Sequence, residues 1–109
     1  MVIKVLDVVR DCQSWANGDI LHKALQTAFN EGDADEVLVS FEGVDDVPSA
    51  FVNAAFLPLL DSWDFQTIRI RLKILNSTRQ INDMIKRRLT FVASARGGEA
   101  DLGDVTRRA

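Results

Sequence analysis

The sequence is poor in the residues that mark secreted, membrane-bound or metal-binding proteins. Among its 109 residues there is one cysteine, Cys12, one histidine, His22, and no tyrosine. A single cysteine cannot form an internal disulfide, so we expect a reducing, cytoplasmic environment. No apolar stretch approaches the roughly 20 residues that cross a bilayer. The first residues also lack the charged, apolar and small-residue zones of a signal peptide.

The composition is typical of one globular domain. Apolar residues make up 47% of the chain and charged residues 27%, which is close to the average of folded proteins. A chain of this length can bury one cooperative core. Because residues 96–109 are rich in Gly, Asp and Arg and contain little apolar material, we predict a domain over residues 1–95 and a flexible tail over residues 96–109.

Charge is unevenly distributed along the chain. The net charge is −3, but residues 1–68 carry three Lys or Arg against twelve carboxylates, and residues 69–109 carry ten against four. Such asymmetry is found in proteins that bind nucleic acid or an acidic partner. The simpler interpretation is that one globule has two solvated faces of opposite charge.

Three segments have the pattern of β-strands. Residues 2–9 are rich in β-branched side chains, which favour extended backbone. Residues 37–41 form a short apolar run between acidic turns, which indicates a buried central strand covered on both faces. Apolar and basic residues alternate over 68–74, as in an edge or half-covered strand.

Two further segments have helical patterns. Residues 21–31 present one apolar and one polar face, and Asn17-Gly18-Asp19 before them offer turn and capping chemistry. Residues 50–60 are apolar almost all round, which is typical of a helix that is buried or used in an interface. Pro58 lies inside this segment, so we expect a kink or an early end near Phe56-Leu57.

The last predicted helix covers residues 78–93. It begins at Ser77, with Gln80 three residues later, which is the spacing of a capping box. Strands that alternate with helices predict an α/β fold. We expect a small single domain with a mixed, mostly parallel sheet of three to five strands and three main helices.

Few residues have the chemistry of a catalytic or metal site. We expect His22, on the polar face of an early helix, to face solvent and be inert, and Cys12 to be a spectator thiol because only Arg10 is basic nearby. Asp45 and Asp46 could bind Mg²⁺, but adjacent carboxylates in a loop are more often turn residues. The chain has neither a phosphate-binding loop with a lysine nor a dinucleotide fingerprint. We therefore expect no enzyme activity, no metal and no cofactor.

Ser49 lies where a loop meets the 50–60 helix. A serine there can cap free backbone amides. The same junction would also stabilise a phosphate, although Asp45 and Asp46 would oppose added negative charge. Asn53, one turn further along, is polar on an otherwise apolar helix. It either pairs with the loop backbone or belongs to a contact surface.

Two adjacent motifs resemble a known family. Residues 39–44 read Val-Ser-Phe-Glu-Gly-Val, and residues 47–56 read Val-Pro-Ser-Ala-Phe-Val-Asn-Ala-Ala-Phe. Their sequence and fixed spacing resemble the STAS-like domain family of unknown function, and so do the basic strand that ends at Leu75-Asn76 and the helix after it. The resemblance covers roughly residues 2–93 and implies a STAS-like fold.

Through that family the chain is distantly similar to STAS domains, including the antagonists of anti-sigma factors. Those proteins bind GHKL-type serine kinases and are switched by phosphorylation of a serine in an Asp-Ser-Ser-Gly segment at the same loop-to-helix junction. Here Ser40 stands where the family usually has Asp, Pro48 replaces the Asp of the antagonist segment, and Ala50-Phe51 replace its second Ser and its Gly. Ser49 is the residue that the resemblance leaves as a candidate phosphorylation site.

The resemblance implies a bacterial regulatory module that binds a GHKL-type ATPase or kinase through residues 43–53. The expected partner-binding residues are Asp45, Asp46, Ser49 and Asn53. The alternative function is association with nucleic acid through the basic half, by Arg69, Arg71, Lys73, Lys86, Arg87 and Arg88. We rank it second because no aromatic residue is interleaved with these cations for base stacking. A third interpretation is a homodimer formed through the apolar 50–60 helix.

Overall fold

Three short parallel strands form the sheet of this domain. The computed structural model describes residues 2–31 and 35–98. Strand β1 (Val2–Lys4) pairs with β2 (Val37–Ser40), and β2 pairs with β3 (Leu72–Leu75). The order β1-β2-β3 places β2 in the centre, as its apolar sequence predicted. The chain is thus mixed α/β with a wholly parallel sheet among these residues.

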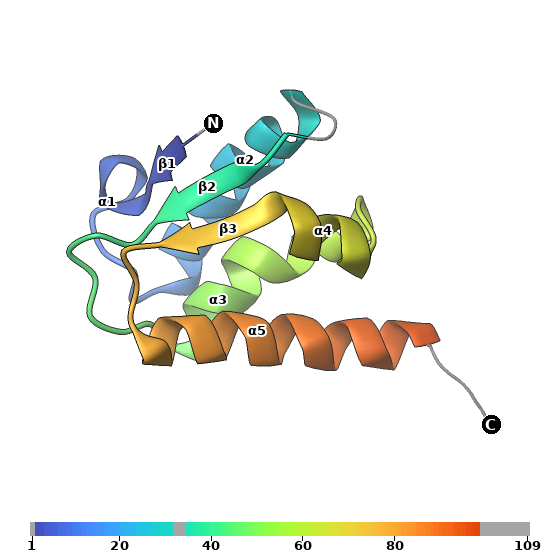
Figure 1. Ribbon diagram of the computed structural model, residues 1–109. Coiled ribbons are helices and arrows are strands. Elements are labelled where there is room, and N and C mark those ends of the chain that lie inside the picture. Colours follow the sequence, from blue (N-terminus) through green and yellow to red (C-terminus); the bar gives the residue numbers. More distant parts are fainter. Residues whose placement is uncertain (1, 32–34, 99–109) are drawn as a thin grey trace.

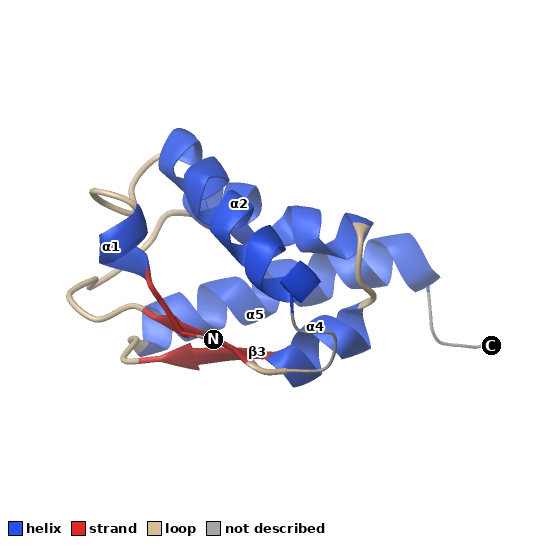
Figure 2. Cartoon of the chain, turned by 90° about the horizontal axis from the view of Figure 1, so that it is seen from above, coloured by secondary structure: helices blue, strands red, loops and turns tan. Residues whose placement is uncertain are grey.

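The helices connect the strands and cover one side of the sheet (Figures 1 and 2). The three main helices of the prediction are present. In chain order the helical segments are α1 (Val5–Val8), α2 (Trp15–Glu31), α3 (Ser49–Phe56), the 3-10 helix η1 (Leu57–Asp61), α4 (Phe65–Arg71), α5 (Arg79–Ala93) and the π-helical turn η2 (Ser94–Gly98). The expected early end at Pro58 is confirmed, because α3 stops at Phe56 and continues as η1. Of the predicted tail, residues 96–98 belong to η2, and residues 99–109 lie outside the described residues.

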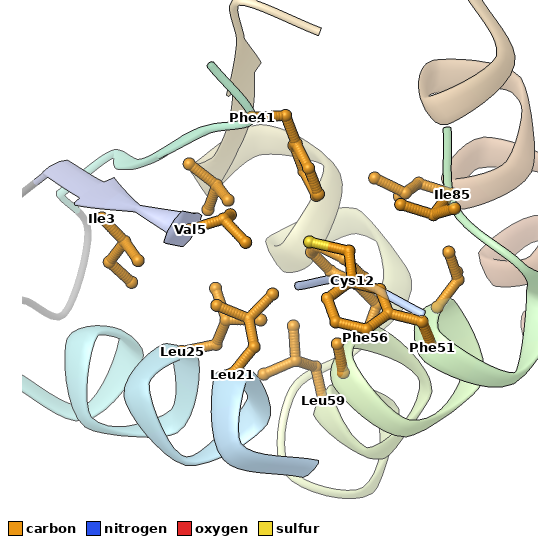
Figure 3. Packing of buried hydrophobic residues seen from close by; sticks show 14 of the residues in the cluster. Ile3, Val5, Cys12, Leu21, Leu25, Phe41, Phe51, Phe56, Leu59 and Ile85 are labelled. Atoms are coloured by element: carbon orange, nitrogen blue, oxygen red, sulfur yellow. The ribbon is translucent and has the colours of Figure 1, made fainter. Parts of the chain in front are cut away.

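The core lies between the sheet and these helices. Phe41, directly after β2, and phenylalanines of α2 and α3 fill its centre, together with leucines of α2 and η1 (Figure 3). On β2, Val37 and Val39 face this core and are at most 1% exposed. The opposite face of β2 carries the half-buried Leu38 and the buried Ser40, whose hydroxyl accepts a hydrogen bond from Asn76 Nδ2. The expectation of a buried central strand is therefore confirmed, with Leu38 as its one half-buried residue.

Two predicted strands are too long. The strand expected over residues 2–9 ends at Lys4, and α1 follows. A helical turn brings both Val5 and Val9 into the core, and their backbone groups are hydrogen-bonded to each other. An extended chain would also place them on one face, so the β-branched composition could not distinguish the two.

The strand expected over residues 68–74 begins only at Leu72. Asp64 caps α4, since its Oδ1 accepts a hydrogen bond from the Thr67 amide at 2.8 Å. In α4, Ile68 is 1% exposed and Ile70 is 64% exposed. A strand would have placed both on the same face, whereas a helix separates residues two apart by about half a turn.

Helix α2 begins earlier than its pattern indicated. It starts at Trp15, and the Ser14 hydroxyl accepts a hydrogen bond from the Asn17 amide. Gly18 therefore lies inside the helix, not in a preceding turn. A Cβ built on Gly18 would approach the Phe51 carbonyl oxygen to 2.5 Å and the Ala54 Cβ to 2.8 Å. The missing side chain lets α2 and α3 cross in close contact.

Candidate functional site

The loop between β2 and α3 lies at the carboxyl edge of the parallel sheet. Ligands of open parallel sheets commonly bind at this edge. A shallow depression of about 300 Å³ lies between this loop and the segment that joins α1 to α2. Asp45 and Asp46 line it from the loop, and Arg10, Asp11 and Cys12 line it from the segment. We call residues 43–53 the 43–53 surface.

The main chain of the loop is held by side chains from two other elements. Gln80 of α5 binds Val47 twice: its Oε1 accepts from the Val47 amide at 3.0 Å, and its Nε2 donates to the Val47 carbonyl at 2.9 Å. The Thr78 hydroxyl donates to the Asp45 carbonyl at 3.1 Å. Gln13 Nε2 lies 3.4 Å from the Asp46 carbonyl oxygen. These bonds fix the backbone while leaving the side chains of Asp45 and Asp46 exposed.

Gly43 makes the turn that starts the loop. Its φ is +88°, a conformation that side chains disfavour. The Val44 amide then donates to the Phe41 carbonyl at 2.9 Å and closes the turn. A Cβ at Gly43 would also approach Leu6 Cδ1 to 3.0 Å. The turn directs the chain away from β2 and toward α5.

Asp45 and Asp46 are the charged groups of this surface. Both residues are exposed, and within the described part of the chain their carboxylates have neither a hydrogen bond nor an ion pair. Asp11, across the depression, binds the Gln13 amide and the Asn17 side chain through Oδ1. The hydrogen-bonded backbone thus presents two carboxylates to solvent.

Ser49 is the first residue of α3, and its expected role as the N-cap is wrong. Pro48 holds the cap position with φ −80° and ψ 161°, and no side chain caps this helix. Ser49 is exposed, and its hydroxyl has no hydrogen-bond partner among the residues that the structure describes. The hydroxyl is accessible beside the amino end of α3.

Asn53 is directed away from the loop. Its Oδ1 accepts a hydrogen bond from Arg88 Nε at 2.9 Å, so it joins α3 to α5. The first expected role, pairing with the loop backbone, is wrong, while the second, a place on a contact surface, stays a prediction. Asn53 supports the position of α3 beneath the loop.

The six basic residues of the alternative function do not share one surface. Arg71 is 3% exposed, donates from Nε to the Asp35 carbonyl at 2.9 Å and stacks over the Phe29 ring. Arg88 is half-buried and bound to Asn53. The exposed members are Arg69 on α4, Lys73 on β3, and Lys86 and Arg87 on α5.

Cys12 and His22, the two residues considered for reactivity and expected to be inert, lie in the interior or at its edge. Cys12 is 2% exposed, and burial, with a smaller contribution from Asp11, raises the pKa of its thiol to about 11. His22 is half-buried, and its Nδ1 lies 3.1 Å from the Ala55 carbonyl oxygen, so the expectation that it faces solvent is wrong. Over the described residues, no group of three or more His, Cys, Asp or Glu is placed to hold a metal ion.

Sequence reasoning missed the two residues that hold the loop. Ser77 and Gln80 had the spacing of a capping box, but Thr78 is the N-cap, and its hydroxyl accepts from the Ile81 amide at 3.2 Å. Gln80 is thereby free to bind Val47, which is 33 residues away. No local pattern marks such a distant contact. The one available signal was that Gln80 is a polar residue in the first turn of a helix.

Comparison with known protein families supports the family resemblance that the sequence motifs indicated. A family described as a STAS-like domain of unknown function matches residues 17–82, which include most of α2 and all of β2, the 43–53 surface and β3. Neither the curated proteins nor the solved structures contain a match. In the described part of the chain no helix is long and apolar enough to span a membrane. The chain belongs to the family of STAS-like domains of unknown function.

Proposed function

We propose that this domain is a non-enzymatic regulatory module that binds a partner protein through the 43–53 surface. The observation that carries the proposal is that Thr78 and Gln80 bind the backbone of residues 45–47, while the side-chain carboxylates of Asp45 and Asp46 stay in solvent. A loop that is ordered before binding loses little conformational entropy when a partner docks.

The electrostatics of this surface favour a partner with a basic patch. Asp45 and Asp46 have no cation bound to them in the described residues, so their charges are available to an incoming protein. Complementary charges steer encounter and select the partner. By the family resemblance, the partner is a GHKL-type ATPase or kinase of a bacterial signalling system.

Ser49 gives this surface a way to be regulated. Its exposed hydroxyl lies at the amino end of α3, whose helix dipole stabilises a phosphate. A phosphate there would add about two negative charges next to Asp45 and Asp46. We propose that phosphorylation of Ser49 weakens the complex, because a strongly hydrated phosphate in the docking surface would have to be desolvated when the partner docks.

The proposal is tested by charge reversal with a matched control. Tagged wild-type protein captures its partner from the native host, and the purified partner is then titrated by calorimetry. The Asp45→Lys/Asp46→Lys variant should bind at least tenfold more weakly, since repulsion replaces attraction. The control, Asp35→Lys/Glu36→Lys, makes the same charge change just before β2, at the opposite edge of the sheet, and should bind like wild type. Equal affinities for both variants would contradict the proposal.

A further inference from the structure

An apolar groove of about 420 Å³ runs between β3 with α4 on one side and α5 on the other. It shares no residue with the 43–53 surface. Its apolar lining comes from all three elements and consists of Phe65, Ile68, Leu72, Ile74, Ile85 and Leu89. Leu72 and Ile74 point to the core side of the sheet yet stay half-exposed, because α5 does not close over them.

One wall of the groove is the free edge of the sheet. Strand β3 is the last in the order β1-β2-β3, so within residues 2–31 and 35–98 no strand pairs with its outer side. Figure 1 shows this edge facing α5. The N–H and C=O groups along such an edge are a template for an added strand, and peptides commonly bind to sheets in this way.

The rim of the groove is positively charged. Arg69 of α4 and Lys86 of α5 line it, and both residues are exposed. Among the described residues, none that lines the groove carries a carboxylate. Residues 69–88 as a whole contain seven Lys or Arg and one carboxylate, Asp83. An occupant with carboxylates beside its apolar side chains would therefore be complementary to the groove in both charge and polarity.

We propose that this groove binds an extended acidic segment of a partner protein, which pairs with β3 as a fourth strand. In an extended segment alternate side chains point to opposite faces. Apolar residues on one face would cover Ile74, Ile85 and Leu89, and carboxylates at neighbouring positions would meet Arg69 and Lys86.

Charge argues against a second copy of this chain as the occupant. Two copies joined along β3 would bring together two edges that each carry exposed cations, such as Lys73. The acidic loop of another copy cannot become the added strand, because Thr78 and Gln80 already bind its backbone at Asp45 and Val47. A segment from a different protein has neither restriction.

The test uses the full chain and two synthetic octapeptides. In one peptide glutamate and valine alternate, and in the other lysine replaces glutamate. Titration of isotope-labelled protein, followed by amide NMR shifts, should show that the glutamate peptide perturbs residues 72–75 and 85–90 and slows amide exchange at the β3 edge. The lysine peptide should bind at least fivefold more weakly. The Arg69→Glu/Lys86→Glu variant should lose at least fivefold in affinity for the glutamate peptide. Lys4→Glu/Lys23→Glu makes the same charge change at two exposed positions outside the groove and should not.

Several results would overturn the proposal. Absence of shifts at millimolar glutamate peptide, equal binding of both peptides, or shifts confined to the 43–53 surface would each contradict it. If the free protein self-associates with the same shifts, the occupant is a second copy. If the amides at the β3 edge already exchange slowly in dilute free protein, residues of the same chain cover this edge. Melting temperatures of the variants, measured by circular dichroism, establish that lost binding is not lost folding.

Discussion

Gln80 holds the candidate site in place, and its removal gives a quantitative test. In the Gln80→Ala variant both hydrogen bonds to Val47 are lost, and Val47 is only 2% exposed. A typical net contribution is about 0.5–1.5 kcal/mol per hydrogen bond, so the free energy of unfolding should fall by about 1–3 kcal/mol. Water can reach part of this contact, because Gln80 itself is exposed, which favours the lower half of the range.

The Gln80→Glu variant separates the two bonds. Its carboxylate can still accept from the Val47 amide but cannot donate to the Val47 carbonyl. At pH 7 it should therefore be destabilised, and the deficit should shrink as the pH falls through the pKa of the carboxyl, because protonation restores a donor. Urea unfolding at several pH values gives these free energies, and hydrogen exchange at the Val47 amide reports the loop directly.

Gln66 provides the matched control. It is an exposed glutamine on α4, and its side chain has no hydrogen bond to any described residue. Its Ala and Glu variants should stay within about 0.5 kcal/mol of wild type. If Gln80→Ala changes stability no more than Gln66→Ala, and the Val47 amide exchanges at the wild-type rate, Gln80 does not hold the loop and the reasoning is refuted.

Three other positions give independent predictions. Gly18→Ala should destabilise the fold by about 2–3 kcal/mol in thermal unfolding, because the new Cβ would meet the Phe51 carbonyl; a gain of stability, usual for this change in a helix, would disprove the close crossing. Ser49→Ala and Ser49→Asp should both unfold within about 0.5 kcal/mol of wild type, since no cap bond is lost; a larger loss in the Ala variant would restore the capping role. The raised pKa of Cys12 contributes stability that is complete below pH 9 and is lost as the pH rises through about 11; a Cys12→Ala variant, compared by urea unfolding across this range, should lack that decline.

The parts of the fold that were predicted correctly from sequence have long periodic patterns or a residue, such as proline, that ends a helix. The apolar run of β2, the helical periodicity of α2 and α5, and the effect of Pro58 each involve neighbours in the chain, where local rules apply. The errors fall at junctions. Residues 5–8 and 68–71 are β-branched or alternating, yet 5–8 form the single turn of α1 and 68–71 form the end of α4, each next to a short strand. Burial outweighs composition in both, and in α4 the Asp64 cap adds to it.

The site was predicted less completely than the fold. The loop that carries Asp45 and Asp46, and its place before the helix at Ser49, were predicted from the sequence. The contacts that define it did not follow, because they join residues about 33 to 35 positions apart, as in the pairs of Val47 with Gln80 and of Asn53 with Arg88. Only the packing of α3 against α5 brings these groups together.

The central claim is that residues 43–53 form the surface on which a partner docks. Hydrogen exchange of the purified complex, measured by mass spectrometry against the free domain, tests it most directly. The expected result is slower exchange over residues 43–53, where amides of the loop and of the first turn of α3 become shielded from solvent. Slower exchange elsewhere, with residues 43–53 exchanging as fast as in the free domain, would contradict it.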